Sequence, residues 1–272
     1  MSLQKKLILT PILFLSILKS KLLHMLDPYR VALPYLKSRE VRSKLNIPAD
    51  SSKWPSSWSA IEFKIFNRFP RTTLPEPKEI SVSLTDALQK RQSCRKFIRE
   101  SISLEEISAL LGHSLRVREK TSQRPYPSGG GRYSVETHIL VQNCSGLSTG
   151  FYYYHPKEHS LYLTLPLSEI PSISAPWTRD ASCIILFSAL WERSSRKYQE
   201  LALPLILIEA GHMAQNILLA TEAMGFGACP LAAFDDEVAE YLLDENPETE
   251  STLYIIPIGN KARDKGANNP DL

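Results

Sequence analysis

The chain lacks the motifs that identify the commonest metal and redox sites. Its 272 residues include four cysteines and six histidines, without a C-x-x-C pair or an H-E-x-x-H motif. Isolated cysteines of this kind favour reduced, buried thiols over a zinc site or a disulfide scaffold. The formal net charge is only +3, and no basic block alternates with aromatic residues. These absences disfavour a metal enzyme and a nucleic-acid-binding protein.

The N-terminal region has an apolar run, Leu7–Leu18, between flanking lysines. Twelve residues are too few to span a bilayer, and Lys-Ser-Lys follows where a signal peptide would have small residues. We expect a helix that packs on the protein or faces a dimer partner. A helix on a membrane surface and a targeting signal are the alternatives. The overall pattern predicts a cytoplasmic protein.

Helix and strand signals interleave along the chain, which predicts an α+β protein with a central sheet. Helices are expected at Leu7–Met25, Tyr35–Lys44, Ser83–Arg91, Ser103–Leu111 with Gly112 as its stop, Leu203–Met224 and Asp235–Leu243. Strands are expected at Ser134–Asn143, Phe151–Tyr154, Leu161–Thr164, Ala181–Leu190 and Thr252–Ile258. Residues 1–80 are interpreted as a helical N-terminal extension and linker, and residues 81–272 as one domain.

A glycine-rich turn stands out after Tyr126, where Pro127-Ser128 leads into three consecutive glycines and then a β-rich run. Glycine lets the backbone approach a ligand closely, and such a turn offers a hydroxyl and several open N–H groups to a flat or anionic cofactor. A mobile turn without a ligand is the alternative interpretation.

Two further segments carry groups that suit a phosphate-bearing ligand. Arg91 and Arg95 are four residues apart, so we expect them to share one face of a helical turn with Ser93 between them. A solvated basic helix end would look the same. Gly225 and Gly227 follow the longest predicted helix and either expose N–H groups to a ligand or simply end that helix.

The pair Lys197-Tyr198 precedes the longest predicted helix. Both side chains titrate near pH ~10 unless their surroundings change them, so either needs help to act as a base. A surface lysine beside a half-buried tyrosine is the alternative. Glu209, His212 and Gln215 add polar groups to an otherwise apolar helix, where they need polar partners or a bound cofactor. We expect His212 to be a core histidine whose ring nitrogens have hydrogen-bond partners.

Taken in order, these segments resemble the nitroreductase superfamily, and within it the SagB/ThcOx-type azoline dehydrogenases. Arg91–Phe97 resembles the flavin-phosphate motif Arg-x-Ser-x-Arg-x-Phe. Tyr126–Glu136 and the Gly-Phe-Tyr-Tyr-Tyr segment from Gly150 resemble that branch, as does Lys197-Tyr198 followed by Glu-Ala-Gly-His-x-x-Gln-Asn from Glu209. The segments Gly225-Phe-Gly, Phe234-Asp-Asp and Pro257-Ile-Gly fit as well. The resemblance covers about residues 54–260.

The resemblance implies a nitroreductase-like fold, with a mostly antiparallel sheet flanked by helices, and an FMN enzyme that is a homodimer with the flavin at its interface. It implies flavin binding by Arg91, Ser93, Arg95, Pro127, Ser128, Gly129, Gly130, Gln215, Gly225, Gly227 and Lys261, with Arg263 as an alternative to Lys261. It makes Lys197 and Tyr198 the candidates for proton abstraction, and it implies no metal ligand.

The implied reaction is dehydrogenation of an azoline ring, of the thiazoline-to-thiazole type, in a peptide or carrier-bound precursor. A hydride goes to flavin N5, oxygen reoxidises the flavin, and a cyclodehydratase or synthetase complex is the expected partner. A general NAD(P)H-dependent flavin reductase or nitroreductase and a non-catalytic subunit are the alternatives. One departure bears on the choice: Leu201–Pro204 is apolar where family members often have an Arg-x-Tyr-Arg-like segment, and Ser134 stands where proline is common.

Overall fold

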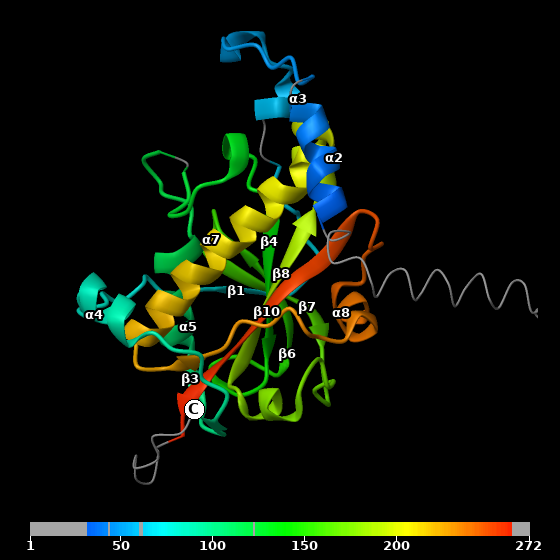
Figure 1. Ribbon diagram of the computed structural model, residues 1–272. Coiled ribbons are helices and arrows are strands. Elements are labelled where there is room, and N and C mark those ends of the chain that lie inside the picture. The colour runs from blue at the N-terminus through cyan, green and yellow to red at the C-terminus, as the bar shows by residue number, and fades with distance from the viewer. Residues whose placement is uncertain (1–31, 43, 60–61, 122, 263–272) are drawn as a thin grey trace, which may run out of the picture. The chain divides into compact units, whose positions relative to one another are not determined.

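The computed structural model of the protein describes residues 32–42, 44–59, 62–121 and 123–262 (Figure 1). The predicted helix at Leu7–Leu18 lies outside these residues. The chain divides into two compact units after Asn46. Helix α2 (Leu33–Arg42) belongs to the first unit, and the second unit contains the sheet and every predicted site residue. A domain boundary at residue 80 stays a prediction.

The second unit alternates helices and strands as the sequence predicts (Figure 1). Its helices are α3 (Ser56–Ser59), α4 (Leu84–Lys90), α5 (Leu104–Leu115), α6 (Trp191–Tyr198), α7 (Ala202–Ala223) and α8 (Asp236–Leu243). Its strands are β1 (Arg71–Thr73), β2 (Phe97–Ile98), β3 (Ile102–Ser103), β4 (Val135–Val141), β5 (Cys144–Ser145), β6 (Gly150–His155), β7 (Ser160–Pro166), β8 (Cys183–Leu190), β9 (Gly227–Ala228) and β10 (Glu250–Lys261).

The main sheet of the described residues has the order β1-β7-β6-β4-β8-β10-β2, with β9 paired to β10. Every neighbouring pair in it is antiparallel, as predicted. Outside this sheet, the short strands β3 and β5 form a parallel pair. Because β10 is long, it pairs with β8 over most of its length and with β2 and β9 near its C-terminal end. That end brings three segments distant in sequence to one place.

Alternation along the central strands builds two apolar layers, one on each face of the sheet. On β8, Ile185 and Phe187 join the larger core under α5 and α7, whereas Ile184 and Leu186 join a smaller core under α8. Successive side chains of a strand point to opposite faces, so a strand covered on both faces is apolar throughout. The unbroken run at residues 183–187 therefore marks the middle of the sandwich.

Local capping signals set the starts of α4 and α5. The Ser83 side chain accepts a hydrogen bond from the Asp86 backbone N–H at the start of α4, and Ser103 with Glu106 forms a complete capping box at α5. The predicted stop at Gly112 is wrong, because α5 continues to Leu115. A Cβ at residue 112 would lie 2.2 Å from Cγ of Pro77, so glycine is needed there for packing rather than for ending a helix.

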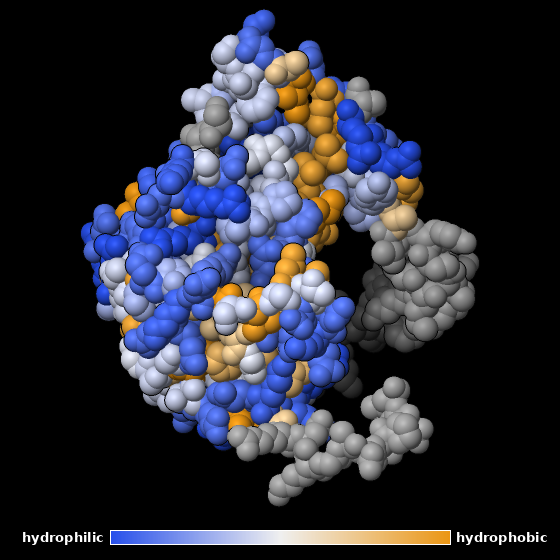
Figure 2. All heavy atoms as spheres, turned by 90° about the vertical axis from the view of Figure 1, so that its left-hand side faces the viewer, coloured by the Kyte–Doolittle hydropathy of each residue, from blue (hydrophilic) through white to orange (hydrophobic). Residues whose placement is uncertain are grey.

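Helix α7 crosses one face of the sheet and organises the proposed site (Figure 1). It buries Ile206, Met213 and Ile217 against the larger core, as the predicted central position requires. Its other face is open: Leu207 is 50% exposed and Ile208 is 55% exposed. The side of the molecule where α4 lies is mostly hydrophilic with scattered hydrophobic groups (Figure 2), and Leu84 and Leu88 of α4 are exposed.

Candidate active site

The predicted site residues fall into two groups at opposite ends of α7. The first, called here the C-terminal group, holds Arg91, Ser93, Arg95, Gly225, Gly227 and Lys261. The second, called here the N-terminal group, holds Pro127, Ser128, Gly129, Gly130, Lys197 and Tyr198. Gln215 is exposed on α7 between them.

Pairing with β10 assembles the C-terminal group. Ser93 forms an isolated bridge with Ala228, and Gly227 and Ala228 pair with Gly259 and Ile258 of β10. Lys261 pairs with Phe97 of β2. A Cβ at Gly227 would lie 2.7 Å from the Cys94 Sγ and 3.1 Å from the Lys261 Cγ, so only glycine lets these segments meet. The three sequence segments therefore form one surface.

The prediction that Arg91 and Arg95 share a helical turn is wrong. Helix α4 ends at Lys90, Arg91 is its C-cap, and the segment beyond it contains only the bridge at Ser93. A basic cluster that directly follows a helix predicts that the helical turn continues through it. The β-bridge to Ala228 requires extended backbone instead. Arg-x-Ser-x-Arg then matches a two-residue repeat, in which alternate side chains share a face.

The charges of the C-terminal group are suited to an anion. Among the described residues, neither Arg91 nor Arg95 has an ion-pair partner, and Arg95 is exposed. The Lys261 Nζ is held between the two carboxylate oxygens of Glu222, at 2.9 and 2.8 Å. Guanidinium groups without a carboxylate partner suit phosphate oxygens well.

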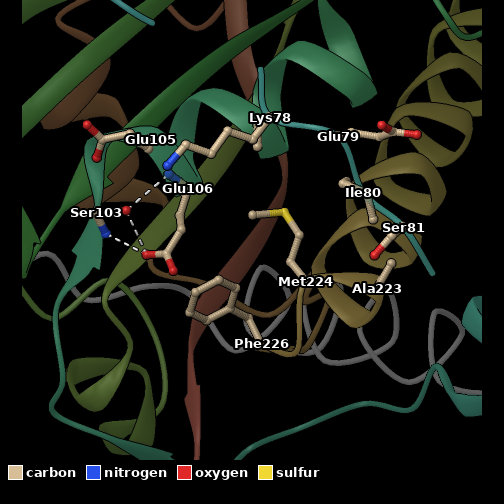
Figure 3. A pocket seen from close by; sticks show the side chains of 11 residues that line it. Lys78, Glu79, Ile80, Ser81, Ser103, Glu105, Glu106, Ala223, Met224 and Phe226 are labelled. Atoms are coloured by element: carbon tan, nitrogen blue, oxygen red, sulfur yellow. Dashed lines mark hydrogen bonds between the residues drawn. The ribbon is translucent and has the colours of Figure 1, made fainter. Parts of the chain in front are cut away.

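A cavity of about 350 Å³ lies beside this group, between the start of α5, residues 78–81 and the end of α7. Figure 3 shows Met224 and Phe226 projecting toward it, with the Ser103–Glu106 capping box at its edge. Phe226 lines this cavity, whereas a Cβ built on Gly227 would point toward Cys94. None of the predicted site residues lines the cavity.

In the N-terminal group, Ser128 is held by a buried carboxylate. Its Oγ donates a hydrogen bond to Glu209 Oε2 on α7 and accepts one from the Tyr133 backbone N–H at 2.8 Å. Glu209 Oε1 also accepts from the Val135 N–H at 3.0 Å. Burial raises the pKa of Glu209, and the Ser128 hydrogen bond opposes that rise. The carboxylate thus ties the glycine turn to α7.

Gly130 lies against both candidate catalytic side chains. It has a φ of +62°, and a Cβ built on it would lie 1.9 Å from Tyr198 Oη and 3.2 Å from Lys197 Nζ. Both the left-handed conformation and the close approach require glycine here. Gly129 beside it packs on the Leu205 side chain of α7. The glycine turn and the Lys-Tyr pair are therefore one local structure.

Lys197 is enclosed by aromatic rings. Only 2% of it is exposed, and its Nζ lies 3.3 Å from the centroid of the Trp54 ring, 5.2 Å from that of Tyr198 and 6.0 Å from that of Trp58. No carboxylate of the described chain pairs with this amine. Burial, with the nearby charge of Arg132, lowers the pKa of Lys197, whereas burial raises the pKa of Tyr198.

Buried arginines hold α6, and with it Lys197, in position. Arg193 forms an ion pair with Glu136 at 2.6 Å and donates to the Tyr133 carbonyl. Arg132 donates to the Arg193 carbonyl at 2.8 Å and to the carbonyls of Ser57 and Trp58. Through these contacts, the family-like segment that ends at Glu136 supports the Lys197–Tyr198 pair. No local sequence pattern points to Arg132, Arg193 or Trp54, because their partners are far away along the chain.

The two groups are too far apart to form one site within a chain. Glu209, which holds the N-terminal group, and Glu222, which holds Lys261, are 13 positions apart on α7. At 1.5 Å per residue they are about 20 Å apart along the helix. Gln215, predicted to bind the cofactor, lies midway and is exposed. His212, expected to be a core histidine, is also exposed, because it lies on the open face of α7.

Residues 88–260 match the model of the nitroreductase family, which is well over half of the chain. The protein MJ1384 of Methanocaldococcus jannaschii, which carries a nitroreductase name, is 29% identical over 195 residues, covering 69% of this chain and 95% of that protein. The microcin B17-processing protein McbC of Escherichia coli is 26% identical over 183 residues, covering 61% of this chain and 65% of McbC.

Solved structures show the same fold. A chain of the E. coli microcin synthetase McbBCD complex with truncated pro-MccB17 bound has a TM-score of 0.55 at 19% identity, covering 90% of this chain and 97% of that chain. A Ralstonia eutropha structure with a nitroreductase title has a TM-score of 0.60 at 23% identity, covering 73% and 93%. The chain belongs to the nitroreductase family and is an FMN-dependent oxidoreductase.

The residues of the C-terminal group fit the cofactor. FMN combines a phosphate with a flat ring system, and the group combines unpaired guanidiniums with glycines that keep the backbone accessible. Gly227 in particular leaves no room for a side chain, and Gly225 has a φ of +86°. The carboxylate of Glu222 in this surface is neutralised by Lys261.

Proposed function

We propose that the protein dehydrogenates azoline rings, of the thiazoline-to-thiazole type, in a peptide or carrier-bound precursor. The observation that carries this proposal is the contact of Gly130 with both Lys197 and Tyr198. It puts a buried amine and a phenol beside a turn proposed to line the flavin. Ring oxidation needs such a base, because a proton and a hydride leave neighbouring carbon atoms. When bound, FMN supplies the hydride acceptor.

The pKa directions assign different roles to the two side chains. The pKa of Lys197 is lowered, so a larger fraction of its amine is neutral near pH 7, and able to accept a proton, than for an exposed lysine. The pKa of Tyr198 is raised, so its hydroxyl stays protonated and serves as a hydrogen-bond donor to the substrate. A base held in this way contributes about 10²–10⁴-fold to the rate. Lys197 is therefore the proposed base.

A homodimer completes the proposed flavin site. The N-terminal group and the C-terminal group lie about 20 Å apart along α7, so one chain does not bring them together. Two antiparallel α7 helices related by a two-fold axis would place the C-terminal group of one copy against the N-terminal group of the other. The exposed face with Leu207, Ile208 and Gly211 is suited to this contact, because no atom lies within 4 Å of a Cβ built at Gly211.

Within this dimer, Arg91, Ser93, Arg95 and Lys261 would hold the phosphate and ribityl, and Gly225 and Gly227 would approach the ring from one side. Pro127, Gly129 and Gly130 of the partner copy would approach from the other side. Ser128 acts through the position of the turn, since its hydroxyl is bonded to Glu209. Gln215, near the middle of the helix pair, would face the partner copy.

The relatives support a peptide substrate. McbC is by name a microcin B17-processing protein, and the fold neighbour is a chain of a synthetase complex with truncated pro-MccB17 bound. By analogy we propose a ribosomal or carrier-bound peptide as substrate and a synthetase or cyclodehydratase as partner, in the cytoplasm.

The test uses the full chain loaded with FMN and a synthetic peptide that carries one thiazoline ring. We expect loss of two hydrogens from the peptide, seen by mass spectrometry, with oxygen consumed. Lys197→Ala should lower turnover by at least about 10²-fold at unchanged FMN content, whereas Lys90→Ala, which removes an exposed lysine outside the Lys-Tyr pair, should have no such effect. Equal turnover by wild type and Lys197→Ala would exclude this base. Rapid NADPH oxidation with quinones but no thiazoline oxidation would favour a general reductase.

A further inference from the structure

The segment whose Trp54 ring contacts Lys197 lies outside the part of the chain that matches the nitroreductase family, which begins at residue 88. It comprises residues 49–57 and includes a short 3-10 turn, Ser51–Lys53, capped by Asp50. Every residue of this segment is exposed except Trp54. A stretch of mostly exposed backbone has little burial to hold it and can open at low cost.

Few contacts attach this segment to the rest of the unit. The Trp54 indole N–H donates to the carbonyl of Pro48, the residue just before the segment, at 2.7 Å. Farther along, the Trp58 indole N–H donates to the Arg196 carbonyl at 3.1 Å, and Arg132 donates to the Ser57 and Trp58 carbonyls. Trp58 is thus fixed to α6, whereas Trp54 touches α6 through its ring face on Lys197.

The indole of Trp54 occupies the approach to the Lys197 amine. At 3.3 Å from the ring centroid, the Nζ lies directly against the aromatic face, and only 2% of the lysine is exposed. A substrate C–H bond has to come within about 3–3.5 Å of a base to transfer its proton. Since the amine is almost fully covered, a reacting carbon reaches it only if a covering group moves, and the indole of Trp54 is the nearest of the three rings.

We propose that Trp54 is a gating residue: residues 49–57 form a lid whose indole covers Lys197 at rest, and a substrate reaches the amine only when this lid opens. The inference rests on the proposed function for the role of Lys197 as the base, but not for the lid itself. The rings of Tyr198 and Trp58 also lie near the amine, 5.2 and 6.0 Å from its Nζ. Aromatic surroundings of this kind favour a flat, uncharged ring, since flat groups stack on aromatic faces.

The lid can be tested without any turnover. Competitive acetylation of the FMN-loaded protein with acetic anhydride, read by mass spectrometry, compares Lys197 with the exposed Lys90 in the same sample. We expect Lys197 to react at least tenfold more slowly than Lys90 in the wild type. Trp54→Ala should raise the Lys197 rate about tenfold, with Trp54→Phe in between. Trp177→Phe is the matched control, because Trp177 packs on Phe97 and is not among the rings of the described chain that lie near Lys197.

The direction of the change in labelling rate distinguishes coverage of the Lys197 amine from a lowered pKa of that amine. A lowered lysine pKa by itself makes acetylation faster, so slow labelling of wild-type Lys197 would indicate that the Trp54 ring covers the amine. Labelling of Lys197 as fast as that of Lys90, or no change in Trp54→Ala at an unaltered melting temperature, would overturn the lid. If Trp54→Ala does not fold, Trp54→Phe decides by the same comparison.

Turnover of the thiazoline peptide gives the second measurement. A lid that competes with substrate predicts a KM at least threefold lower in Trp54→Phe at similar kcat, whereas a merely structural tryptophan would lower kcat and protein stability together. If the labelling result is as expected but the wild type never oxidises the peptide, the proposed function fails and the lid stands. If the peptide is oxidised but Lys197 labels freely, the reverse holds.

Discussion

Replacing Gly130 with alanine isolates the contact on which the proposed chemistry depends. The new Cβ would lie 1.9 Å from Tyr198 Oη, against an ordinary contact distance of about 3.5 Å, so the hydroxyl has to move by about 1.5 Å. A misplacement of about 1 Å in a catalytic group can cost 10²-fold in rate. We therefore expect Gly130→Ala to oxidise a thiazoline peptide at least about 10²-fold more slowly than the wild type.

The neighbouring Gly131 is a matched control. It has nearly the same left-handed φ, +66° against +62°, but no atom lies within 4 Å of a Cβ built on it. Both variants incur a backbone cost of about 1–2 kcal/mol, so both should melt a few degrees lower than the wild type. Only Gly130→Ala should lose turnover. The assay is the initial rate at saturating FMN, with thermal unfolding measured on the same samples.

Equal rates in Gly130→Ala and Gly131→Ala would refute the reasoning, because the backbone cost would then account for everything. A double variant gives a further check. Tyr198→Phe removes the clashing oxygen, so the effects of Gly130→Ala and Tyr198→Phe should be clearly less than additive.

Four further outcomes follow from the structure. Gly227→Ala should weaken FMN binding at least tenfold in a flavin-fluorescence titration, because its Cβ would lie 2.7 Å from the Cys94 Sγ; an unchanged affinity would remove Gly227 from the site. Glu222→Gln, which leaves Lys261 without its carboxylate, should raise the affinity for FMN by on the order of threefold but leave the affinity for riboflavin unchanged. This is the size of one screened charge contact. Ile208→Glu, on the open face of α7, should give monomers by light scattering and lose FMN, whereas Leu88→Glu on α4 should give neither. Lys64 and His138 hold the pKa of Glu250 well below its usual range against desolvation, so Glu250 stabilises the fold above its ordinary pKa and loses this effect as pH falls. The urea midpoint of the wild type should therefore fall more steeply below about pH 5 than that of Glu250→Gln, and parallel curves would contradict this.

Features set by neighbouring residues could be predicted from the sequence. Ser83, Ser103 and Asp235 each cap a helix within three residues of themselves, so their positions are visible in a short window. The run Ala181–Leu190 and the long apolar helix also follow from a local pattern, and both lie where that pattern predicts, in β8 and α7. Burial on two faces is the physical reason, since it removes polar residues from a strand altogether.

Features set by distant partners could not be predicted in this way. Gly112 resembles a helix stop until Pro77 is known to pack against it. Arg91 and Arg95 lie on extended backbone because of the bridge between Ser93 and Ala228. The Ser128 hydroxyl is hydrogen-bonded to Glu209 rather than open to a ligand. Motif order predicts which residues belong to the site, but only the fold shows that they divide between the two ends of α7.

The apolar stretch Leu201–Pro204 has a consequence for Lys197. In relatives this stretch often carries cations, whose nearby charge would lower the pKa of the lysine. Here it forms the turn into α7 with Ala202 buried, and Arg132 is the charge that lowers the pKa of Lys197. Burial acts in the same direction, whereas the Trp54 ring favours the ammonium form. Opening of the lid would therefore both expose the amine and remove an interaction that keeps it charged. A base that becomes available in this way needs no cation on the substrate path, so the path is suited to an uncharged ring.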